Sequence, residues 1–381
     1  MRALEQVFGA LLMLAVLLDV FLTVLYARVE TGILSHKLAR LTWRLFRLIP
    51  AGRYRPVVLS FCGPAILVLL VLTWSVLLAF GAGLIIHPEL STGVRASSGE
   101  TPTDLVTAVY VGGSSLSIVG ASNFAPHTAA MKAMFLFNSV VGTSVISLTL
   151  TYLMQIYAAL RERNALGLKM HAMSAETGDA AELVSSLFPD GELSGGYNNL
   201  SELAGEMAQT KEGHHFYPVL FYFRFREPYY SVSRTTLLAL DTVSLIKSAL
   251  ADDKAGWVKK SAAVQQLWSV SLMLVSTLDD TFLDQTPETK DVPTEHNAEP
   301  WRARYFAALQ RLREAGLPLV ADEETGAELY VNLRRRWEPL IAALAPAMAY
   351  SMDEIDPARS RPQAERDHRC RNGSAQPSAR P

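Results

Sequence analysis

The chain has 381 residues, half of them hydrophobic, and a formal net charge of −2 at pH 7. This balance of charge gives no support to a nucleic-acid-binding protein, which would carry a concentrated positive face. The apolar residues concentrate before residue 160, so we expect a membrane part followed by a domain of ordinary globular composition. The two cysteines, Cys62 in an apolar run and Cys370 in a polar tail, indicate neither a disulfide framework nor a thiolate metal site.

Three apolar runs are long enough to cross a bilayer, which needs about 20 residues of helix. They cover residues 7–27, 57–86 and 133–160, and only the first contains a charged side chain, Asp19. A signal peptide is the alternative for the first run, but the run has no small-residue cleavage site and carries Asp19 in its core. Two roles stay open for Asp19: pairing with a cation or with a hydroxyl of another span, or packing as a hydrogen-bonded residue between helices.

The basic residues predict the direction of insertion, because short loops rich in Lys and Arg stay in the cytoplasm. The loop 28–56 contains a single acidic residue, Glu30. Its basic residues are Arg28, Lys37, Arg40, Arg44, Arg47, Arg53 and Arg55. The segment 87–132 has only Arg95 and Lys132. We therefore expect a multi-pass protein of the plasma (inner) membrane, with its amino terminus and residues 87–132 outside and its carboxyl-terminal half in the cytoplasm.

Part of the basic loop, residues 33–48, has the period of an amphipathic helix. Its apolar face consists of Ile33, Leu34, Leu38, Leu41, Leu45 and Leu48. Most of the basic side chains lie off that face, which is typical of a helix lying on the inner membrane surface. The alternative is a cytoplasmic linker helix that packs on the carboxyl-terminal domain.

The segment between the second and third runs, residues 103–126, has the sequence TDLVTAVYVGGSSLSIVGASNFAP. Its first half predicts a short helix that Thr103 or Asp104 can cap. Its second half is a run of small and hydroxyl residues that ends at Pro126. A helix that enters the membrane and returns as an extended strand fits this pattern, since non-helical backbone at that depth is tolerated where it lines a cavity.

Residues 117–126, SIVGASNFAP, resemble the filter of the potassium-channel family, T-T-V-G-Y-G-D-x-x-P, and Val119, Gly120 and Pro126 match it outright. In that family, backbone carbonyls from four such loops replace the hydration shell of the ion. The resemblance implies a carbonyl ladder from Ile118 to Ala121, with a hydroxyl at its base. The implied filter residues are Ser117, Ile118, Val119, Gly120, Ala121 and Ser122, with Ser114 and Asn123 as filter support.

Three positions depart from the family pattern. Ile118 stands where the family has a threonine that coordinates the innermost ion, and Ala121 replaces the aromatic residue that braces the filter. Ser122 replaces the second glycine, which commonly takes a positive φ that costs a residue with a Cβ about 1 kcal/mol. Ion selectivity, and conduction itself, therefore stay open.

The third apolar run contains one glycine, Gly142. Inner helices of the family often carry a hinge glycine at about this distance from the filter, so the resemblance implies a gating hinge at Gly142. Hydroxyl residues follow it, namely Ser144, Ser147, Thr149 and Thr151. They can line a wet pore, or they can bond back to the preceding turn, as any membrane helix permits.

The carboxyl-terminal half has strong helical patterns over residues 233–250, 262–282, 300–315 and about 325–350, with Ser231 or Ser233 as a cap for the first. No Gly-x-Gly-x-x-Gly motif follows a strand, so the sequence does not indicate a nucleotide-binding domain. The aromatic segment between residues 213 and 231 could pack on the inner mouth of the pore or form ordinary core. His214 and His215 lack a carboxylate or cysteine at ligand spacing, so we expect no metal site there.

The sequence thus predicts an all-α membrane protein with three transmembrane helices, a re-entrant pore helix with its filter loop, and a mostly α-helical cytoplasmic domain. The segments are 1–56 (first span and interfacial helix), 57–160 (pore module), 161–356 (cytoplasmic domain) and 357–381 (disordered tail). The expected function is a homotetrameric cation channel in the lipid bilayer, with potassium as the expected ion, because one loop cannot encircle an ion.

We expect neither enzymatic activity nor a cofactor besides the permeating monovalent cation. The cytoplasmic domain would take an unidentified regulatory ligand, and nothing in the spans resembles the repeated arginines of a voltage sensor. The alternative function is a non-conducting, membrane-anchored sensor or scaffold whose pore loop is degenerate.

Overall fold

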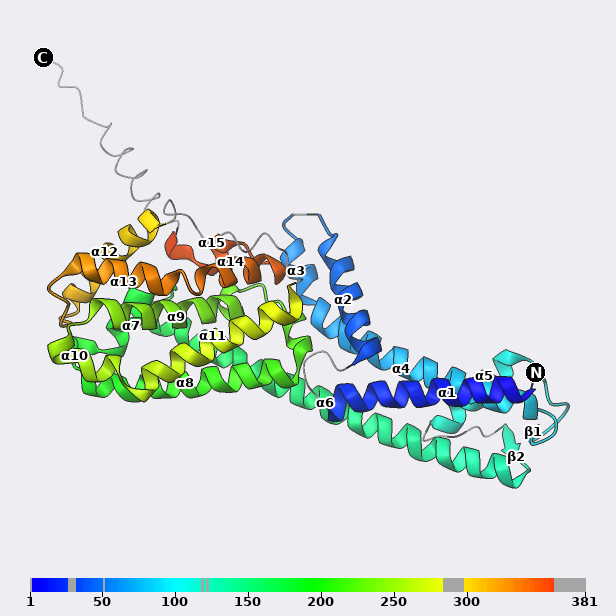
Figure 1. Cartoon of the computed structure of the whole chain (residues 1–381). Helices are drawn as coiled ribbons and strands as arrows, with labels where there is room; N and C mark the ends of the chain where they lie inside the picture. Colours follow the sequence, from blue (N-terminus) through cyan, green and yellow to red (C-terminus); the bar gives the residue numbers. More distant parts are fainter. Residues whose placement is uncertain are drawn as a thin grey trace, which may run out of the picture. The chain divides into compact units, whose positions relative to one another are not determined.

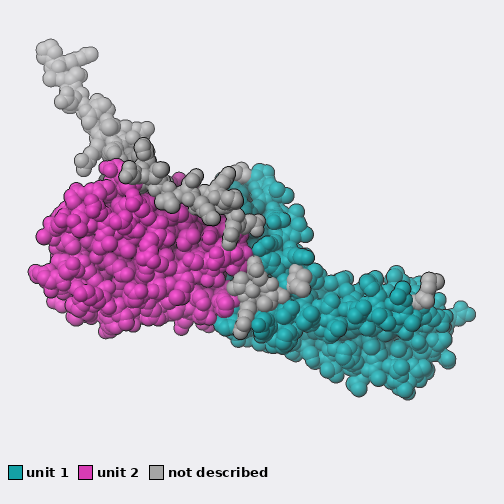
Figure 2. Space-filling view, viewed as in Figure 1, with its two compact units in different colours: residues 1–158, 216–223 teal, residues 159–215, 224–381 magenta. Residues whose placement is uncertain are grey.

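A computed structural model describes residues 2–26, 32–50, 52–117, 120, 123–283 and 298–359. They are mostly helical (Figure 1) and form two compact units (Figure 2). Unit 1 consists of Met1–Ala158 and Phe216–Phe223, and unit 2 of Ala159–His215 and Arg224–Pro381. The division falls inside one long helix, two residues before the predicted domain boundary at residue 160.

Within the described residues, three helices are long and apolar enough to cross a membrane. They are α1 (Arg2–Val20), which continues as a π-helical turn η1 (Phe21–Leu25), α4 (Cys62–Ile86), and α6 (Ala129–Met173). The other elements of unit 1 are α2 (Ile33–Arg47), α3 (Arg55–Ser60), α5 (Leu105–Leu116), β1 (Val94–Ala96) and β2 (Phe124–Pro126).

All three spans differ from their predicted runs, and the first begins at Arg2 rather than at residue 7. The second run begins with the separate helix α3, because Pro64 has no N–H and its ring would clash with the carbonyl of Ser60 four residues back. The third run ends at residue 160, yet α6 continues to Met173. The apolar composition ends there, but the residues that follow, RERNALGLKM, are mostly good helix formers, so the helix goes on.

Helix α4 lies between α1 and α5 and packs on both. Its contact with α5 is a close approach of two backbones, because Gly83 and Gly112 face each other. A Cβ on Gly112 would lie only 2.5 Å from the backbone nitrogen of Gly83. Such small residues are what joins helices in lipid, where the hydrophobic effect does not drive helices together.

Asp19, buried in α1, accepts three hydrogen bonds. The donors are the backbone N–H of Leu34 at 2.9 Å, the hydroxyl of Ser35 at 2.6 Å and the indole N–H of Trp74 at 2.9 Å. These contacts fasten α1 to the first turn of α2 and to the middle of α4. They are the contacts of a hydrogen-bonded residue that packs between helices.

Strands β1 and β2 form an antiparallel pair in which Arg95 lies opposite Ala125. The backbone N–H of Ser97 donates to the carbonyl of Asn123 at 2.8 Å, which extends the pairing by one bond. The sequence analysis did not predict this pair, because three-residue strands are too short to show an alternating pattern. The pair joins the two ends of the segment that contains α5.

The aromatic segment Phe216–Phe223 belongs to unit 1, although the residues on both sides of it belong to unit 2. The ring of Tyr222 lies 5.8 Å from that of Trp43 in α2, and the ring of Phe223 lies 6.2 Å from that of Tyr157 in α6. The segment therefore packs with the membrane helices rather than in the core of unit 2.

Unit 2 is helical throughout its described residues, apart from short connections. Its helices are α7 (Ala180–Leu187), α8 (Leu193–Phe216), α9 (Val232–Ala249), α10 (Asp252–Lys259), α11 (Ala262–Phe282), α12 (Ala298–Glu314), α13 (Glu323–Arg334), α14 (Glu338–Ala347) and α15 (Met352–Ile355). The pattern over 325–350 predicts one helix, but the structure has two, and Pro339 lies in the first turn of the second. Ser231 is the cap position of α9, but its side chain makes no capping bond.

A buried group of charges holds unit 2 together around α9. Asp241, with no exposed surface, pairs with Arg334 at 3.0 Å and with Arg304 at 2.7 Å, and both arginines also pair with Asp356. Burial alone would raise the pKa of the Asp356 carboxyl, but the two guanidinium groups outweigh it and hold that pKa below its usual value. Removing one member of such a group leaves a buried charge unpaired, which costs about 3–5 kcal/mol.

His214, near the end of α8, is buried, and neither of its ring nitrogens has a hydrogen-bond partner among the described residues. Burial, and then the nearby Arg163 charge, lower the pKa of His214 to about 3. The ring is therefore neutral in the folded protein, whereas an unfolded histidine titrates at about 6.5. Between these two pH values unfolding takes up a proton, so stability falls as the pH falls.

Replacing His214 by leucine is expected to remove this loss of stability at low pH. The variant should match the parent protein to within about 1.5 kcal/mol at pH 7.5, since the change roughly conserves volume. At pH 5 it should melt at a higher temperature than the parent protein in circular dichroism. His215→Leu, in the same turn, is the control. Parallel pH profiles of parent protein and H214L would contradict the assignment.

Candidate functional site

Helix α5 begins at a well-formed cap. The carboxylate of Asp104 accepts hydrogen bonds from the backbone N–H of Thr107 at 2.9 Å and from its hydroxyl at 2.7 Å. Both bonds lower the pKa of the Asp104 carboxyl, and the bond from the backbone N–H has the larger effect. Of the two caps expected, the structure uses Asp104, and its negative charge is favourable at the positive end of the helix dipole.

Helix α5 ends at Leu116, where the candidate filter begins. The backbone N–H of Ser117 donates to the carbonyl of Ser114 at 3.1 Å, and that of Gly120 donates to Ser117 at 3.2 Å. Gly120 has φ +71°, a left-handed conformation that favours glycine. Four of the predicted filter residues lie outside the described residues, namely Ile118, Val119, Ala121 and Ser122. The description resumes at Asn123, next to β2.

Gly142 lies where α6 crosses the end of α5. A Cβ on Gly142 would lie 1.8 Å from the carbonyl oxygen of Leu116, so only glycine allows this approach. Helix α6 is continuous through Gly142. The structure thus gives Gly142 a contact role that the sequence analysis, which expected a hinge, did not foresee.

A polar pair joins the same two helices one turn away. The amide nitrogen of Asn138, in α6, donates to the hydroxyl of Ser115 at 2.8 Å, and that hydroxyl donates to the carbonyl of Gly112 at 2.7 Å. Asn138 is fully buried, and its side-chain oxygen has no hydrogen-bond partner among the described residues. The sequence analysis did not single out this pair, although Asn138 is the only asparagine of the third apolar run.

The hydroxyl residues after Gly142 do not share one face. Ser144, Ser147 and Thr151 are exposed on α6, whereas Thr149 is buried. Thr149 therefore does not belong with the other three as a candidate lining residue. The hydroxyl of Thr151 also donates to the carbonyl of Ser147 at 3.0 Å. Thr151 therefore bonds back to the preceding turn and also lies on the exposed face, so the two alternatives do not exclude each other.

A second polar cluster lies at the end of unit 1 that carries the start of α1 and the β1–β2 pair (Figure 1). His87 Nδ1 lies 2.6 Å from the carboxylate of Glu5, and its Nε2 lies 3.2 Å from the carbonyl of Thr103. One ring therefore links the first helix, the end of α4 and the residue before the α5 cap.

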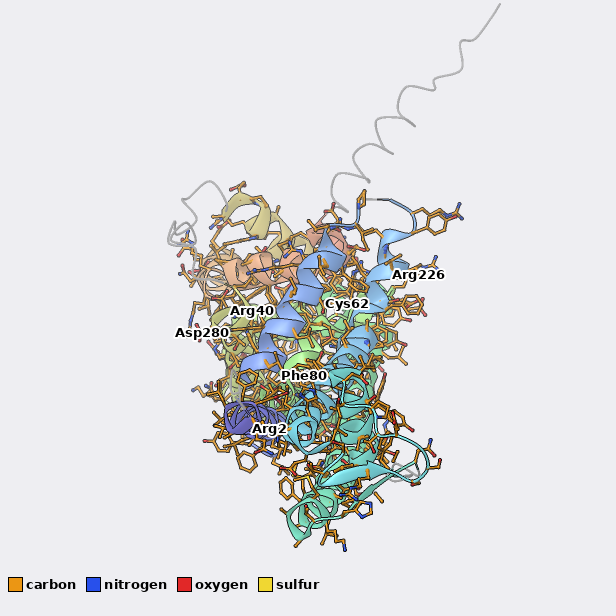
Figure 3. All side chains as sticks on the ribbon, turned by 90° about the vertical axis from the view of Figure 1, so that its right-hand side faces the viewer. Arg2, Arg40, Cys62, Phe80, Arg226 and Asp280 are labelled. Carbon is orange, nitrogen blue, oxygen red and sulfur yellow. The ribbon has the colours of Figure 1, made fainter. Side chains whose placement is uncertain are left out.

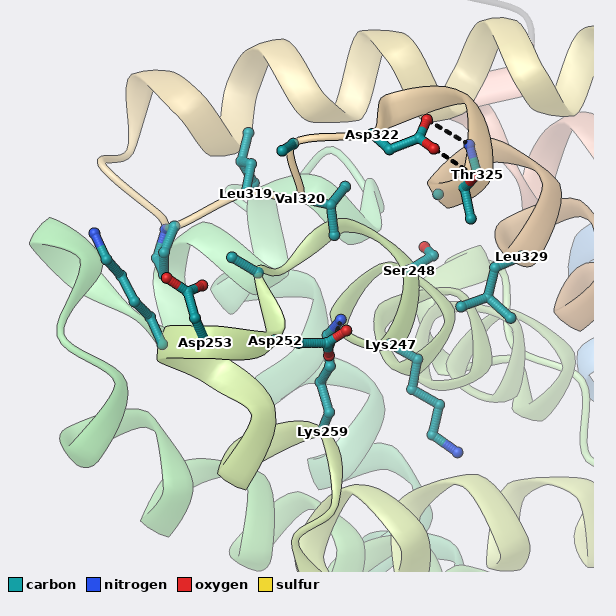
Figure 4. Close-up of a pocket in the computed structure, with 15 residues that line it drawn as sticks. Lys247, Ser248, Asp252, Asp253, Lys259, Leu319, Val320, Asp322, Thr325 and Leu329 are labelled. Carbon is teal, nitrogen blue, oxygen red and sulfur yellow. Dashed lines mark hydrogen bonds and ion pairs between the residues drawn. The ribbon is translucent and has the colours of Figure 1, made fainter.

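Unit 2 has a hollow of about 640 Å³ between the end of α9 and the starts of α10 and α13 (Figure 4). Lys247, Lys254 and Lys259 line it together with three aspartates, and Asp322 caps α13 through Thr325. Because the lining carries charges of both signs, it does not indicate any one class of ligand. Among the described residues, no group of three or more His, Cys, Asp or Glu side chains could hold a metal ion.

Comparison with known proteins gives one informative relative. The chain is similar to the uncharacterized membrane protein YdjJ of Bacillus subtilis strain 168, with 22% identity over 215 residues, which are 56% of this chain and 61% of that protein. The match thus spans less than two thirds of the relative's length. No protein-family model and no solved structure matches the chain. Together with the three apolar helices, the similarity shows that this chain is a membrane protein in contact with lipid.

The contact at Gly142 can be tested with the buried thiol of Cys62 in α4 as the reporter. In a Cys370→Ser background, heating exposes only Cys62 to a thiol-reactive dye. Gly142→Ala forces Leu116 away, and such overpacking typically costs about 1–3 kcal/mol. We expect a clearly lower labelling temperature, whereas the neighbouring exposed Thr143→Ala should leave it unchanged. Equal temperatures for the two variants would refute the contact.

Proposed function

We propose that the chain is one subunit of a homotetrameric cation channel, with potassium as the expected ion. The ion would pass through a filter formed by residues 117–122 of four subunits. Passive flux would follow the electrochemical gradient, so the protein needs neither an active site nor a cofactor.

The observation that carries this proposal is the path of the chain between α4 and α6. A capped helix of 12 residues ends at Leu116, a left-handed residue follows at Gly120, and the chain returns beside its own entry point at Ser97. This is a helix followed by a non-helical return between two apolar helices. Non-helical backbone at membrane depth needs protein or water around it, and a pore supplies both.

The tetramer follows from the number of loops. One loop presents its carbonyls from one side only, whereas dehydrating a cation requires ligands all around it. Four copies about a symmetry axis would close the ring, and closed cyclic assemblies are the usual solution for identical chains. The carbonyl ends of four α5 helices would then carry partial negative charge toward the axis.

Helix α6 would line the inner part of the pore. The exposed hydroxyls of Ser144, Ser147 and Thr151 suit a wet surface. Gly142 would remain the gating position, because bending there changes the distance between α6 and the Leu116 carbonyl at the base of the filter. The amino terminus would lie outside and unit 2 would lie in the cytoplasm, as the basic residues of loop 28–56 indicate.

The second candidate is a non-conducting membrane sensor or scaffold. The observation that favours it is the altered filter sequence, above all Ser122 in place of a glycine. Such a loop would still fold between two helices but would form no ring of carbonyls. The protein would then not conduct, and its spans and unit 2 would act as the membrane sensor or scaffold.

Recording from the purified protein in planar bilayers distinguishes the two candidates. We expect cation currents in potassium gradients, and Gly120→Ala should reduce them at least ten-fold, because a Cβ at φ +71° costs about 1–2 kcal/mol in each subunit. Gly99 is the matched control: it has φ +79° and equally open surroundings, but lies outside the filter. Gly99→Ala should conduct normally. Absence of current in potassium and in sodium from a verified tetramer would favour the scaffold.

Accessibility from the inner side tests the lining role of α6. In a Cys62→Ala, Cys370→Ser background, Ser147→Cys should react with a charged methanethiosulfonate reagent and lose current, since a charge would then stand in the pore. Ile156→Cys, in the same helix but with no exposed surface, should be unaffected. Equal effects at both positions would contradict the lining assignment.

A further inference from the structure

Helix α2 has a buried face and an exposed apolar face. On the buried face, Trp43 is 6% exposed, and its ring packs at 5.8 Å against that of Tyr222. On the exposed face, Leu41, Leu45 and Leu48 are 56%, 57% and 76% exposed. Their spacing of four and three residues places them in one stripe along the helix.

A third face of α2 is basic and adjoins the leucine stripe. Lys37, Arg44 and Arg47 are exposed, and at about 100° per residue they lie side by side next to the leucines. Arg40, labelled in Figure 3, adds a half-buried charge to this face. No acidic residue occurs in α2, so nothing on the helix neutralises this charge.

The start of α2 lies beside an apolar helix. Leu34 and Ser35, in the first turn of α2, donate to Asp19. Asp19 precedes the end of η1 at Leu25 by six residues, or about 9 Å along a helix. The start of α2 is therefore attached within an apolar span, and the exposed leucines come later in the same helix. The exposed Tyr54 follows α2, and aromatic residues are common at membrane interfaces.

We propose that α2 is a binding surface for anionic phospholipids of the inner leaflet. Leu41, Leu45 and Leu48 insert among the acyl chains, while Lys37, Arg44 and Arg47 contact the headgroup phosphates. Three adjacent exposed leucines are costly in water, and insertion among acyl chains removes that cost. Charge complementarity selects anionic over zwitterionic headgroups, since each basic side chain near the surface adds to the attraction. The proposal is independent of whether the pore conducts.

The test uses the full-length protein with Cys62→Ala and Cys370→Ser, reconstituted into vesicles with brominated acyl chains. A bimane label at Leu45→Cys reports lipid contact through quenching by the bromine. Met273 is the matched control, because it is an apolar residue of α11 with the same 57% exposure. We expect the label at position 45 to be quenched in vesicles that contain phosphatidylglycerol and the label at position 273 to stay bright.

A second arm tests the charges. In phosphatidylcholine alone, quenching at position 45 should be weaker than in the phosphatidylglycerol mixture. The preference is measured as the difference in quenching at position 45 between the two lipid mixtures. Each charge removed should weaken the preference for phosphatidylglycerol about five-fold, so the triple variant K37Q/R44Q/R47Q should show none. The double variant R302Q/R313Q, which removes charges from α12 in unit 2, should leave the preference unchanged.

The alternatives give different results. Equal brightness at positions 45 and 273 would mean that water covers the leucine stripe and would overturn the proposal. A blue-shifted label without quenching would mean that protein, such as a second copy, covers it, and would overturn it too. Quenching that is equal in both lipid mixtures would overturn the anionic preference.

Discussion

The close approach of α5 to the two apolar helices on either side is the constraint on which unit 1 depends. On one side Gly83 and Gly112 bring the backbones of α4 and α5 together, and on the other Gly142 admits the carbonyl of Leu116. The hydrophobic effect does not drive helices together in lipid, so close packing has to hold the apolar helices to their neighbours. At Gly83, Gly112 and Gly142 the absence of a Cβ allows this close packing of α5 against α4 and α6.

Polar side chains determine which helices pack against each other. Asp19, His87 and Asn138 each connect a membrane helix to a different neighbour, and Asp19 receives three donors. In an apolar medium an unpaired polar group is costly, so each of these bonds selects one arrangement of helices over others of similar shape. Unit 2 uses the same principle with full charges, around Asp241 and Arg334.

The long elements were predictable from the sequence and the contacts between them were not. Apolar runs of more than 20 residues and helical periods over 233–250 and 262–282 indicate helices whatever surrounds them. The break at Ser60 follows from Pro64, two residues into α4, and composition alone does not reveal it. Pairs such as Asn138 and Ser115 depend on how two helices cross, which a single sequence does not specify. Thr149 illustrates the same limit, since only about half a turn of helix separates the exposed Ser147 and Thr151 from the buried Thr149.

The segment Phe216–Phe223 has a consequence for biosynthesis. A chain emerging from the ribosome presents its three apolar helices first, but Phe223, whose ring covers the backbone at Gly63, is made only after α7 and α8. Unit 1 therefore cannot reach its final packing during membrane insertion, and the usual order, in which the amino-terminal domain folds first, does not hold. Unit 1 is complete only after the first segment of unit 2, Ala159–His215, has been translated.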